Sequence, residues 1–241
     1  MMNNDNKQQD GLLISALGQT GAGLGGEVSG RHIAAVIFDF DGTLGDTRSL
    51  IVRTMQQTIA ELGLPKRTDD ECAAMIGLPL KRTFTELIPM TDEMGDRCAE
   101  VYSRLFDINN VPGAVPLFPH VAETIAALHA RGLTLTVASS RHRSSLVAYL
   151  DALQLAPYIS YVLGADDVKE AKPAPDMVIK TLKDNNLQPD DVVVVGDTVF
   201  DIRMAHNAGV KAVGVTYGNG SREDLLAEGA EWVIDDFGEL M

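Results

Sequence analysis

The chain has 241 residues, which at roughly 150 residues per domain corresponds to one large domain or two modest ones. Hydrophobic residues make up 45% and charged residues 22%, a composition typical of a folded globular protein and not of a disordered one. With 20 Lys and Arg against 34 Asp and Glu, the formal net charge is −14, and so acidic a surface repels nucleic-acid phosphates and anionic lipids. We therefore expect neither a nucleic-acid partner nor a membrane partner.

Cysteine usage and the N-terminal sequence favour a cytoplasmic protein. Cys72 and Cys98 are too few for a disulfide framework and fit a reducing compartment best. The N-terminus is polar, and the apolar stretch that follows is too short for a secretion signal. No run approaches the roughly 18 apolar residues of a membrane helix. Residues 1–30, rich in Asn, Gln and Gly, predict a flexible tail.

From residue 34 onward, apolar runs alternate with helical patterns. Six runs predict buried strands, at residues 34–38, 133–138, 161–165, 192–195, 212–215 and 232–234. Helical spacing between the runs, as at Val121, Ile125 and Leu128, predicts crossover helices. Strand alternating with helix is typical of an α/β protein with a doubly wound, mostly parallel sheet.

Residues 48–113 interrupt this alternation. They show apolar residues at helical spacing and no convincing strand. The sequence thus predicts an all-helical cap domain, residues 48–113, inserted into an α/β core made of residues 31–47 and 114–241. The two linkers, near residues 45–47 and 112–116, are the expected hinges of this cap.

Polar side chains follow three of the predicted strands. Asp39 follows the first strand, Ser139 the second and Asp197 the fourth. Parallel strands bring their carboxyl ends to one edge of the sheet, where α/β proteins bind ligands. One polar strand end would mean little, and Ser139 alone also fits an ordinary helix cap. Three such ends together predict a single site.

The residues around these strand ends suit a magnesium ion and a phosphate group. Asp39 and Asp41, in FDFDGTL, point the same way on an extended backbone, which is costly unless a cation or a proton lies between them. Asp197 and Asp201, in GDTVFD, add two more acids. Lys172, in AKPAPD, is a positive group on a stretch stiffened by prolines. Carboxylate oxygens suit Mg²⁺, and a Lys with a Ser hydroxyl suits a phosphate.

The order of these motifs resembles the haloacid dehalogenase (HAD) superfamily of phosphohydrolases, which use an aspartate nucleophile. DxDGT, a Ser after a strand, Lys-Pro and GDTxxD follow one another as in that family, over roughly residues 33–236. The helical insertion resembles the cap of its phosphoglycolate phosphatase-like branch. The resemblance implies a Mg²⁺-dependent hydrolase acting on a small phosphorylated metabolite, phosphoglycolate-like or a sugar phosphate, through an aspartyl phosphate. We expect a monomer or a homodimer.

The resemblance also assigns roles to the motif residues. Asp39 would be the nucleophile, and Asp41 would protonate the leaving group and then activate water. Ser139 and Lys172 would bind the transferring phosphoryl group. The metal would be held by the carboxylates of Asp39 and Asp197 and by the main-chain carbonyl of Asp41.

Further residues around the motifs have weaker assignments. Asp201 would orient Lys172, or would act only as an acid at a helix N-terminus, or both. Thr43, Ser140 and Arg82 are weak candidates for substrate contact. Residues 141–143, Arg-His-Arg, are expected to form a solvated first helical turn rather than a substrate clamp.

Three other functions stay open. A phosphosugar mutase of the beta-phosphoglucomutase type would share the fold, but mutases of this family carry a His early in the cap, where this chain has Ile51. A phosphoaccepting signalling module also uses an acidic pocket, but such receiver domains run to about 120 residues, lack a helical insertion and need no Asp41. The third alternative is a pyrophosphatase.

Overall fold

The computed structural model describes residues 33–241, and its core is a parallel sheet of six strands in the order β3-β2-β1-β4-β5-β6. The strands are β1 (Ala35–Phe38), β2 (Thr134–Ala138), β3 (Tyr161–Leu163), β4 (Val192–Gly196), β5 (Lys211–Val215) and β6 (Trp232–Ile234). Every strand predicted from an apolar run is present, so the predicted α/β fold is confirmed. The predicted tail lies outside the described residues.

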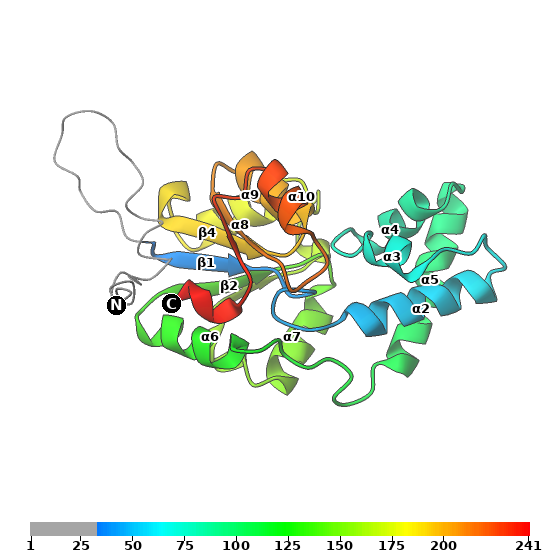
Figure 1. Cartoon of the computed structure of the whole chain (residues 1–241), viewed down its shortest axis with the longest axis horizontal. Coiled ribbons are helices and arrows are strands. Elements are labelled where there is room, and N and C mark those ends of the chain that lie inside the picture. The colour runs from blue at the N-terminus through cyan, green and yellow to red at the C-terminus, as the bar shows by residue number, and fades with distance from the viewer. Residues whose placement is uncertain (1–32) are drawn as a thin grey trace, which may run out of the picture.

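The alternation of side chains along the strands divides the core between the two faces of the sheet. In β1, Val36 and Phe38 face one layer of helices, and Ala35 and Ile37 face the other. The first layer contains α6 (Val121–Ala130) and α7 (Arg143–Ala152), and the second contains α8 (Asp176–Asp184), α9 (Val199–Asn207) and α10 (Arg222–Ala227). Figure 1 shows these two layers on opposite sides of the strands. Because helices cover both faces of the sheet, the strands appear in the sequence as continuous apolar runs.

Short 3-10 helices complete the core. They are η1 (Ala156–Tyr158), η2 (Ala165–Asp167), η3 (Pro189–Asp191) and η4 (Phe237–Leu240). The last of these packs against α6, with Phe237 and Leu240 buried in the same hydrophobic cluster, and the side chain of His120 contacts both carboxylate oxygens of Asp236 at 2.7 Å. The C-terminal end of the described chain is thereby attached to the first layer of helices.

Four helices form the cap, to one side of the sheet (Figure 1). They are α2 (Arg48–Glu61), α3 (Asp69–Ala73), α4 (Leu80–Leu87) and α5 (Asp92–Asn109). At the starts of α3 and α5, the hydroxyls of Thr68 and Thr91 accept hydrogen bonds from backbone N–H groups of the first helical turn. The two linkers to the core lie side by side, since Gly45 bridges Leu117 and the Asp46 N–H donates to the Pro116 carbonyl at 2.9 Å.

The strand order places a crevice at the end of β1. The chain leaves β1 for β2 on one side of the sheet and later returns to β4 on the other side, so the order reverses at β1. The helices after β2 and β4 lie on opposite faces, and the carboxyl ends of the strands point toward the cap (Figure 1). A reversal of this kind opens a ligand-binding crevice in α/β sheets.

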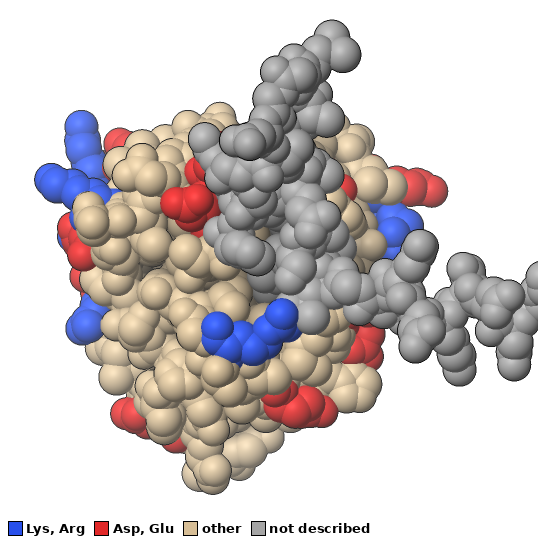
Figure 2. All heavy atoms as spheres, turned by 90° about the vertical axis from the view of Figure 1, so that its left-hand side faces the viewer, with Lys and Arg blue, Asp and Glu red and all other residues tan. Residues whose placement is uncertain are grey.

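The opposite end of the core carries acidic and basic side chains in small, mixed groups on its visible surface (Figure 2). Neither acidic nor basic side chains form a broad patch on the coloured part of this surface. Within residues 33–241, no helix has the length and apolar character that crossing a bilayer would require.

Candidate active site

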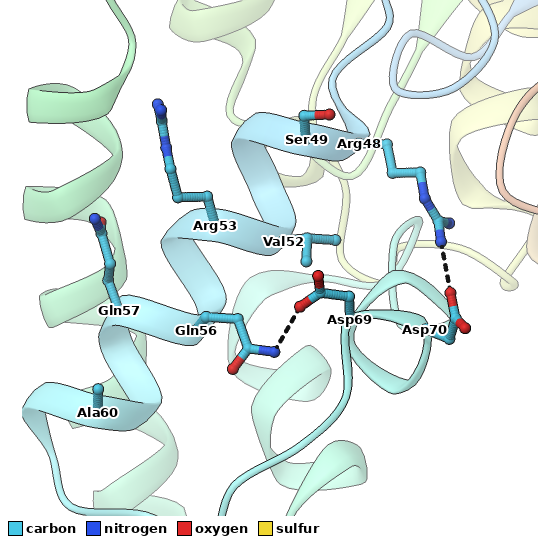
Figure 3. A pocket seen from close by; sticks show the side chains of 9 residues that line it. All are labelled: Arg48, Ser49, Val52, Arg53, Gln56, Gln57, Ala60, Asp69 and Asp70. Carbon is cyan, nitrogen blue, oxygen red and sulfur yellow. Dashed lines mark hydrogen bonds and ion pairs between the residues drawn. The ribbon is translucent and has the colours of Figure 1, made fainter.

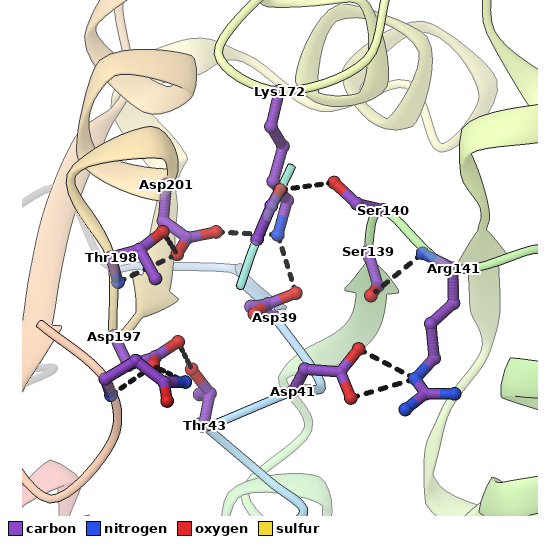
Figure 4. Close-up of polar contacts among 12 residues, drawn as sticks. Asp39, Asp41, Thr43, Ser139, Ser140, Arg141, Lys172, Asp197, Thr198 and Asp201 are labelled. Atoms are coloured by element: carbon purple, nitrogen blue, oxygen red, sulfur yellow. Dashed lines mark hydrogen bonds and ion pairs between the residues drawn. The ribbon is translucent and has the colours of Figure 1, made fainter. Parts of the chain in front are cut away.

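The strand ends bring the predicted motif residues together (Figure 4). Asp39 follows β1, and its two neighbours in the sheet end next to Ser139 and Asp197. All three side chains are almost fully buried. The parallel register therefore places two carboxylates and a hydroxyl around the crevice at the end of β1.

Lys172 reaches this group from the loop between β3 and α8. Its ammonium donates to one oxygen of Asp39 and to one oxygen of Asp201, both at 2.6 Å, and the side chain has no solvent exposure. Burial acts to lower the pKa of Lys172, but the two carboxylates outweigh it and raise the pKa above its usual range. The lysine is thus held as a cation between two acids.

Asp201 makes contacts that belong to both of its predicted roles. One oxygen accepts from Lys172, and the other accepts from the N–H and the hydroxyl of Thr198 at 3.0 and 2.7 Å. The second set forms the capping box of α9. Because both of its oxygens are engaged, Asp201 holds Lys172 in place while it starts the helix.

Asp39 has one oxygen on Lys172 and a second oxygen, Oδ2, that is buried without a hydrogen-bond partner among the described residues. Burial raises the pKa of the Asp39 carboxyl well above its usual range, the lysine opposes this shift, and the neighbouring carboxylates add to it. An unpartnered buried carboxylate oxygen is costly. Its position indicates a place for a positive group.

Asp197 is the second acid beside that place. Its Oδ1 accepts from the Thr43 hydroxyl at 3.3 Å, and its Oδ2 accepts from the backbone N–H and the side-chain amide of Asn219 at 2.7 and 2.9 Å. Burial, followed by the charge of Asp201, raises the pKa of Asp197 to about 7. Oxygens of Asp39, Asp197 and Asp201 lie within 4.8 Å of one another. Carboxylate oxygens are hard donors of the kind that suit Mg²⁺, so this group could hold such an ion.

Glycines allow the close approach of these segments. Gly42 has φ +86°, and a Cβ there would lie 2.2 Å from Oδ2 of Asp197. A Cβ at Gly218, in the loop after β5, would lie 2.4 Å from the same side chain. The DxDGT turn and the loop that carries Asn219 can therefore both touch Asp197 only because these two residues have no side chain.

Asp41 lies beside Asp39 but turns toward Arg141 (Figure 4). The Nε of Arg141 contacts the two oxygens of Asp41 at 2.8 and 2.7 Å, and both side chains are about 90% buried. Burial acts to lower the pKa of Arg141, but the Asp41 carboxylate outweighs it and raises the pKa. The guanidinium also lies 4.9 Å from the Phe106 ring of α5 and 5.0 Å from the Tyr149 ring of α7. Arg141 thus connects Asp41 with both core and cap.

The expectation that residues 141–143 form a solvated helical turn is wrong for Arg141. Helix α7 begins only at Arg143, and Arg141 belongs to a loop whose backbone bonds to the Ser139 hydroxyl and to the Ala165 N–H. The loop therefore directs Arg141 inward. His142 and Arg143 are solvated as expected, with side chains 77% and 55% exposed.

The weaker candidates occupy different places. Thr43 is buried against Asp197, where it supports that acid. Ser140 lies at the cavity, and its hydroxyl donates to the Gly77 carbonyl of the cap at 2.6 Å. Arg82 is not among the residues that line the cavity, and its guanidinium pairs with Glu86 one turn along α4.

A cavity of about 890 Å³ lies between the cap and this group of residues. Its core wall includes Asp39, Asp41 and Ser139, and its cap wall comes from α2, α4, α5 and the loop from residue 75 to 79. A second hollow of about 760 Å³ lies along α2 and α3 (Figure 3). In that hollow Gln56 bonds to Asp69 at 2.9 Å and Arg48 to Asp70 at 3.0 Å, and none of the motif residues lines it. The first cavity is the candidate active site.

The chain matches the family model of haloacid dehalogenase-like hydrolases over residues 36–215. This protein belongs to the haloacid dehalogenase-like hydrolase family. The match begins in β1 and ends with β5, so it spans every motif described above.

Named relatives of this HAD-family hydrolase include phosphatases and a pyrophosphatase. It is 37% identical over 209 residues to the probable phosphatase IndB of Dickeya dadantii, covering 86% of this chain and 91% of that one. It is 30% identical over 234 residues to a phosphoglycolate phosphatase of Salmonella typhimurium, covering 88% and 92%. A haloacid dehalogenase-like hydrolase from Bacteroides fragilis superposes with a TM-score of 0.82 at 27% identity, covering 86% and 99%. The predicted resemblance and the predicted enzyme class, a HAD-type phosphatase, are confirmed.

Proposed function

We propose that this protein hydrolyses a small phosphomonoester with the help of Mg²⁺ and with Asp39 as the nucleophile. The observation that carries the proposal is the state of Asp39. It is a buried carboxylate at the crevice, held by Lys172 through one oxygen, and its other oxygen has no hydrogen-bond partner among the described residues. One of its oxygens lies within 4.8 Å of a carboxylate oxygen of Asp197. A side chain with that arrangement has a fixed direction and a cavity in front of it.

The first step is transfer of the phosphoryl group to Asp39. A carboxylate oxygen of Asp39 forms a bond to phosphorus while the bond from phosphorus to the alcohol oxygen breaks. Asp41 delivers a proton to the departing oxygen. Lys172, which is bonded to Asp39, and Ser139, which lines the cavity, would bind the phosphoryl oxygens and reduce the repulsion between the two anions.

The second step is hydrolysis of the aspartyl phosphate. Asp41 takes a proton from water, the water oxygen bonds to phosphorus, and the bond to Asp39 breaks to release phosphate. A bound Mg²⁺, held by Asp39, Asp197 and the Asp41 carbonyl, would supply positive charge next to the phosphoryl group. Asp201 and Asn219 fix the positions of Lys172 and Asp197 throughout.

Ile51 favours hydrolysis over the mutase alternative. This residue occupies the place where mutases of the family carry a His, and it lines the cavity near the acids. An isoleucine side chain has no group that can exchange a proton with Asp41 or bind it. In this chain, nothing at that position delays the attack of water on the aspartyl phosphate.

Phosphate release from p-nitrophenyl phosphate tests the proposal. We expect turnover with Mg²⁺, loss of turnover in excess EDTA and its return when Mg²⁺ is restored. We also expect Ca²⁺ to inhibit, because it accepts more ligands at longer distances and would change the orientation of the Asp39 carboxylate toward phosphorus. Full activity after dialysis against EDTA would contradict the metal requirement, and absence of any phosphatase activity with Mg²⁺ would contradict the proposed function.

A further inference from the structure

The walls of the active-site cavity that lie beyond the reacting groups indicate what the alcohol half of the substrate is. The phosphoryl group must meet Asp39, so the alcohol occupies the space under the cap. That space belongs to a cavity of about 890 Å³, within the range of about 300–1,000 Å³ that is usual for small-molecule sites. A two-carbon alcohol such as glycolate would leave most of it to water.

Each basic residue that lines the cavity already faces an acid. Arg141 holds Asp41 at 2.7 Å, and Lys81 lies 3.2 and 3.0 Å from the carboxylates of Asp92 and Asp96. The third, His142, is exposed and lies 3.5 Å from Asp166. Among the described residues, the wall therefore offers no unpaired cation to a second anionic group of a substrate.

Acidic residues are more numerous on the cap wall than basic ones. Asp96, Glu100 and Asp107 lie on one stripe of α5 at helical spacing, with Ser103 between them, and all four line the cavity. Glu100 pairs with Arg97 at 2.9 Å, whereas Asp107 has no ion-pair partner among the described residues. A substrate carboxylate on this side would meet like charge, while hydroxyl groups can donate hydrogen bonds to the acids.

Apolar side chains form the part of the wall next to the acids of the reaction centre. Ile51 and Met55 come from α2, Ile76 and Leu78 from the cap loop, and Tyr102 and Phe106 from the stripe of α5 beside the acidic one. A ring or another flat apolar surface can pack there. The cap thus presents both an apolar surface and an acidic, hydroxyl-bearing stripe to the same cavity.

We propose that the substrate is the phosphomonoester of an uncharged, hydroxyl-bearing ring compound of sugar or nucleoside size, and not of a carboxylic acid. The proposal rests on the proposed phosphatase function and specifies its substrate class. It separates this enzyme from the phosphoglycolate phosphatases among its relatives, because the cap wall, as far as the structure describes it, lacks a free cation for the glycolate carboxylate.

Steady-state kinetics of the full chain with Mg²⁺ test the substrate class. The panel contains phosphoglycolate, ribose 5-phosphate, glucose 6-phosphate and uridine 5′-monophosphate, with p-nitrophenyl phosphate as the reference. We expect the best neutral-alcohol ester to exceed phosphoglycolate at least tenfold in kcat/KM. If phosphoglycolate equals or exceeds every neutral ester, the substrate class is wrong, although hydrolysis of the reference ester would still support the phosphatase function. If the reference ester is also inert, the phosphatase function itself fails.

A charge reversal on α5 tests whether the cap wall causes this preference. Asp107→Lys places a cation on the cavity wall, and Ile108→Lys places one on the next residue, whose side chain is 63% exposed and does not line the cavity. We expect Asp107→Lys to raise the ratio of kcat/KM for phosphoglycolate to that for ribose 5-phosphate about three- to tenfold. Ile108→Lys should leave that ratio within about twofold. An unchanged ratio in Asp107→Lys, or an equal change in both variants, would overturn the role of the acidic stripe.

Discussion

Asp39 is surrounded by charges that the fold holds at close range. Burial, and after it three other carboxylates, raise the pKa of its carboxyl group, and Lys172 is the one cation in direct contact with it among the described residues. A structural role would not require so costly a cluster inside an α/β core. Its cost is understandable if the acids bind a metal and react, because functional sites retain charges that stability alone would remove.

Replacement of Asp39 by Asn should therefore remove activity and leave the fold intact. An amide cannot supply the anionic oxygen that attacks phosphorus, so we expect kcat to fall by at least about 10³-fold. The melting temperature should not decrease, because one of the clustered negative charges is lost. Asp46→Asn, on the exposed part of the linker, is the control and should keep its activity. A retained activity above a tenth of wild type would contradict the covalent mechanism.

Arg141 is expected to position Asp41. Arg141→Met should lower kcat/KM for an alkyl phosphate by about 10²-fold, since general acid catalysis is worth about 10²–10⁴. The loss should be smaller for p-nitrophenyl phosphate, because nitrophenolate departs without a proton. Arg141→Lys should restore part of the activity.

Arg143→Met is the matched control, because this neighbouring arginine is solvated and belongs to α7. The Arg143→Met variant should leave kcat/KM unchanged for both substrates. If Arg141→Met reduced kcat/KM equally for good and poor leaving groups, Arg141 would have only a structural role in the loop.

At the scale of elements, a charged pair joins the start of η4 to the start of α6. His120, which precedes α6, contacts Asp236, and this carboxylate raises the pKa of the imidazole. The pKa of Asp236 is lowered: burial acts to raise it, but the Gly238 N–H and then the His120 side chain outweigh burial. Because the pKa of His120 is raised in the folded state, its stabilisation is complete below the unfolded pKa of about 6.5 and disappears as the pH rises through the folded pKa. Because the pKa of Asp236 is lowered in the folded state, the stabilisation that Asp236 contributes disappears only as the pH falls through its folded pKa, which lies below the usual value of 3.8.

His120→Asn tests this pair. Asn removes the charge and tolerates the left-handed backbone at this position, where φ is 62°. We expect the variant to melt below wild type at pH 5.5 and to melt at the same temperature at pH 9. A difference in melting temperature that does not change between these two pH values would show that the charge of His120 contributes nothing.

The strands and the motif acids could be predicted from sequence, whereas their supporting residues could not. A strand such as β4 is buried on both faces, so its apolar run alone predicts it, and the residue after it is placed by the sheet. Arg141 and Asn219 owe their positions to contacts between segments distant in the chain. The start of α7 at Arg143 could not be predicted from sequence either, because a backbone hydrogen bond from the distant Ala165 holds the preceding loop. The glycines around Asn219 were the only local signal of a close approach.

At the scale of the whole molecule, the cap contacts the core at the reacting groups. The Ser140 hydroxyl bonds to Gly77 of the cap, and Tyr149 donates to Asn110 beyond α5 at 2.7 Å. Asp39 lines the cavity at this boundary, together with residues of the cap. The proposed hydrolysis requires water to be excluded in the first step and admitted in the second, which favours a cap that moves on the linkers at residues 45–47 and 112–116.

Hydrogen exchange with and without Mg²⁺ and beryllofluoride should reveal this motion. We expect the phosphate analogue to slow exchange in the loop from residue 75 to 79 and in both linkers, with little change within α2 and α5. The strands of the core, which are buried in both states, serve as the internal reference. Equal exchange at the loop and the linkers in both conditions would mean that the cap stays fixed.

The pairing of the two linkers has a consequence for how such enzymes diversify. Because residues 45 and 117 bridge one another, the cap begins and ends at nearly the same point in space. A segment whose ends meet can be replaced by another of different length without altering the register of the sheet. The cap can therefore be replaced as one unit, which would change the substrate that is accepted, while the carboxylates, the lysine and the strands of the core stay the same.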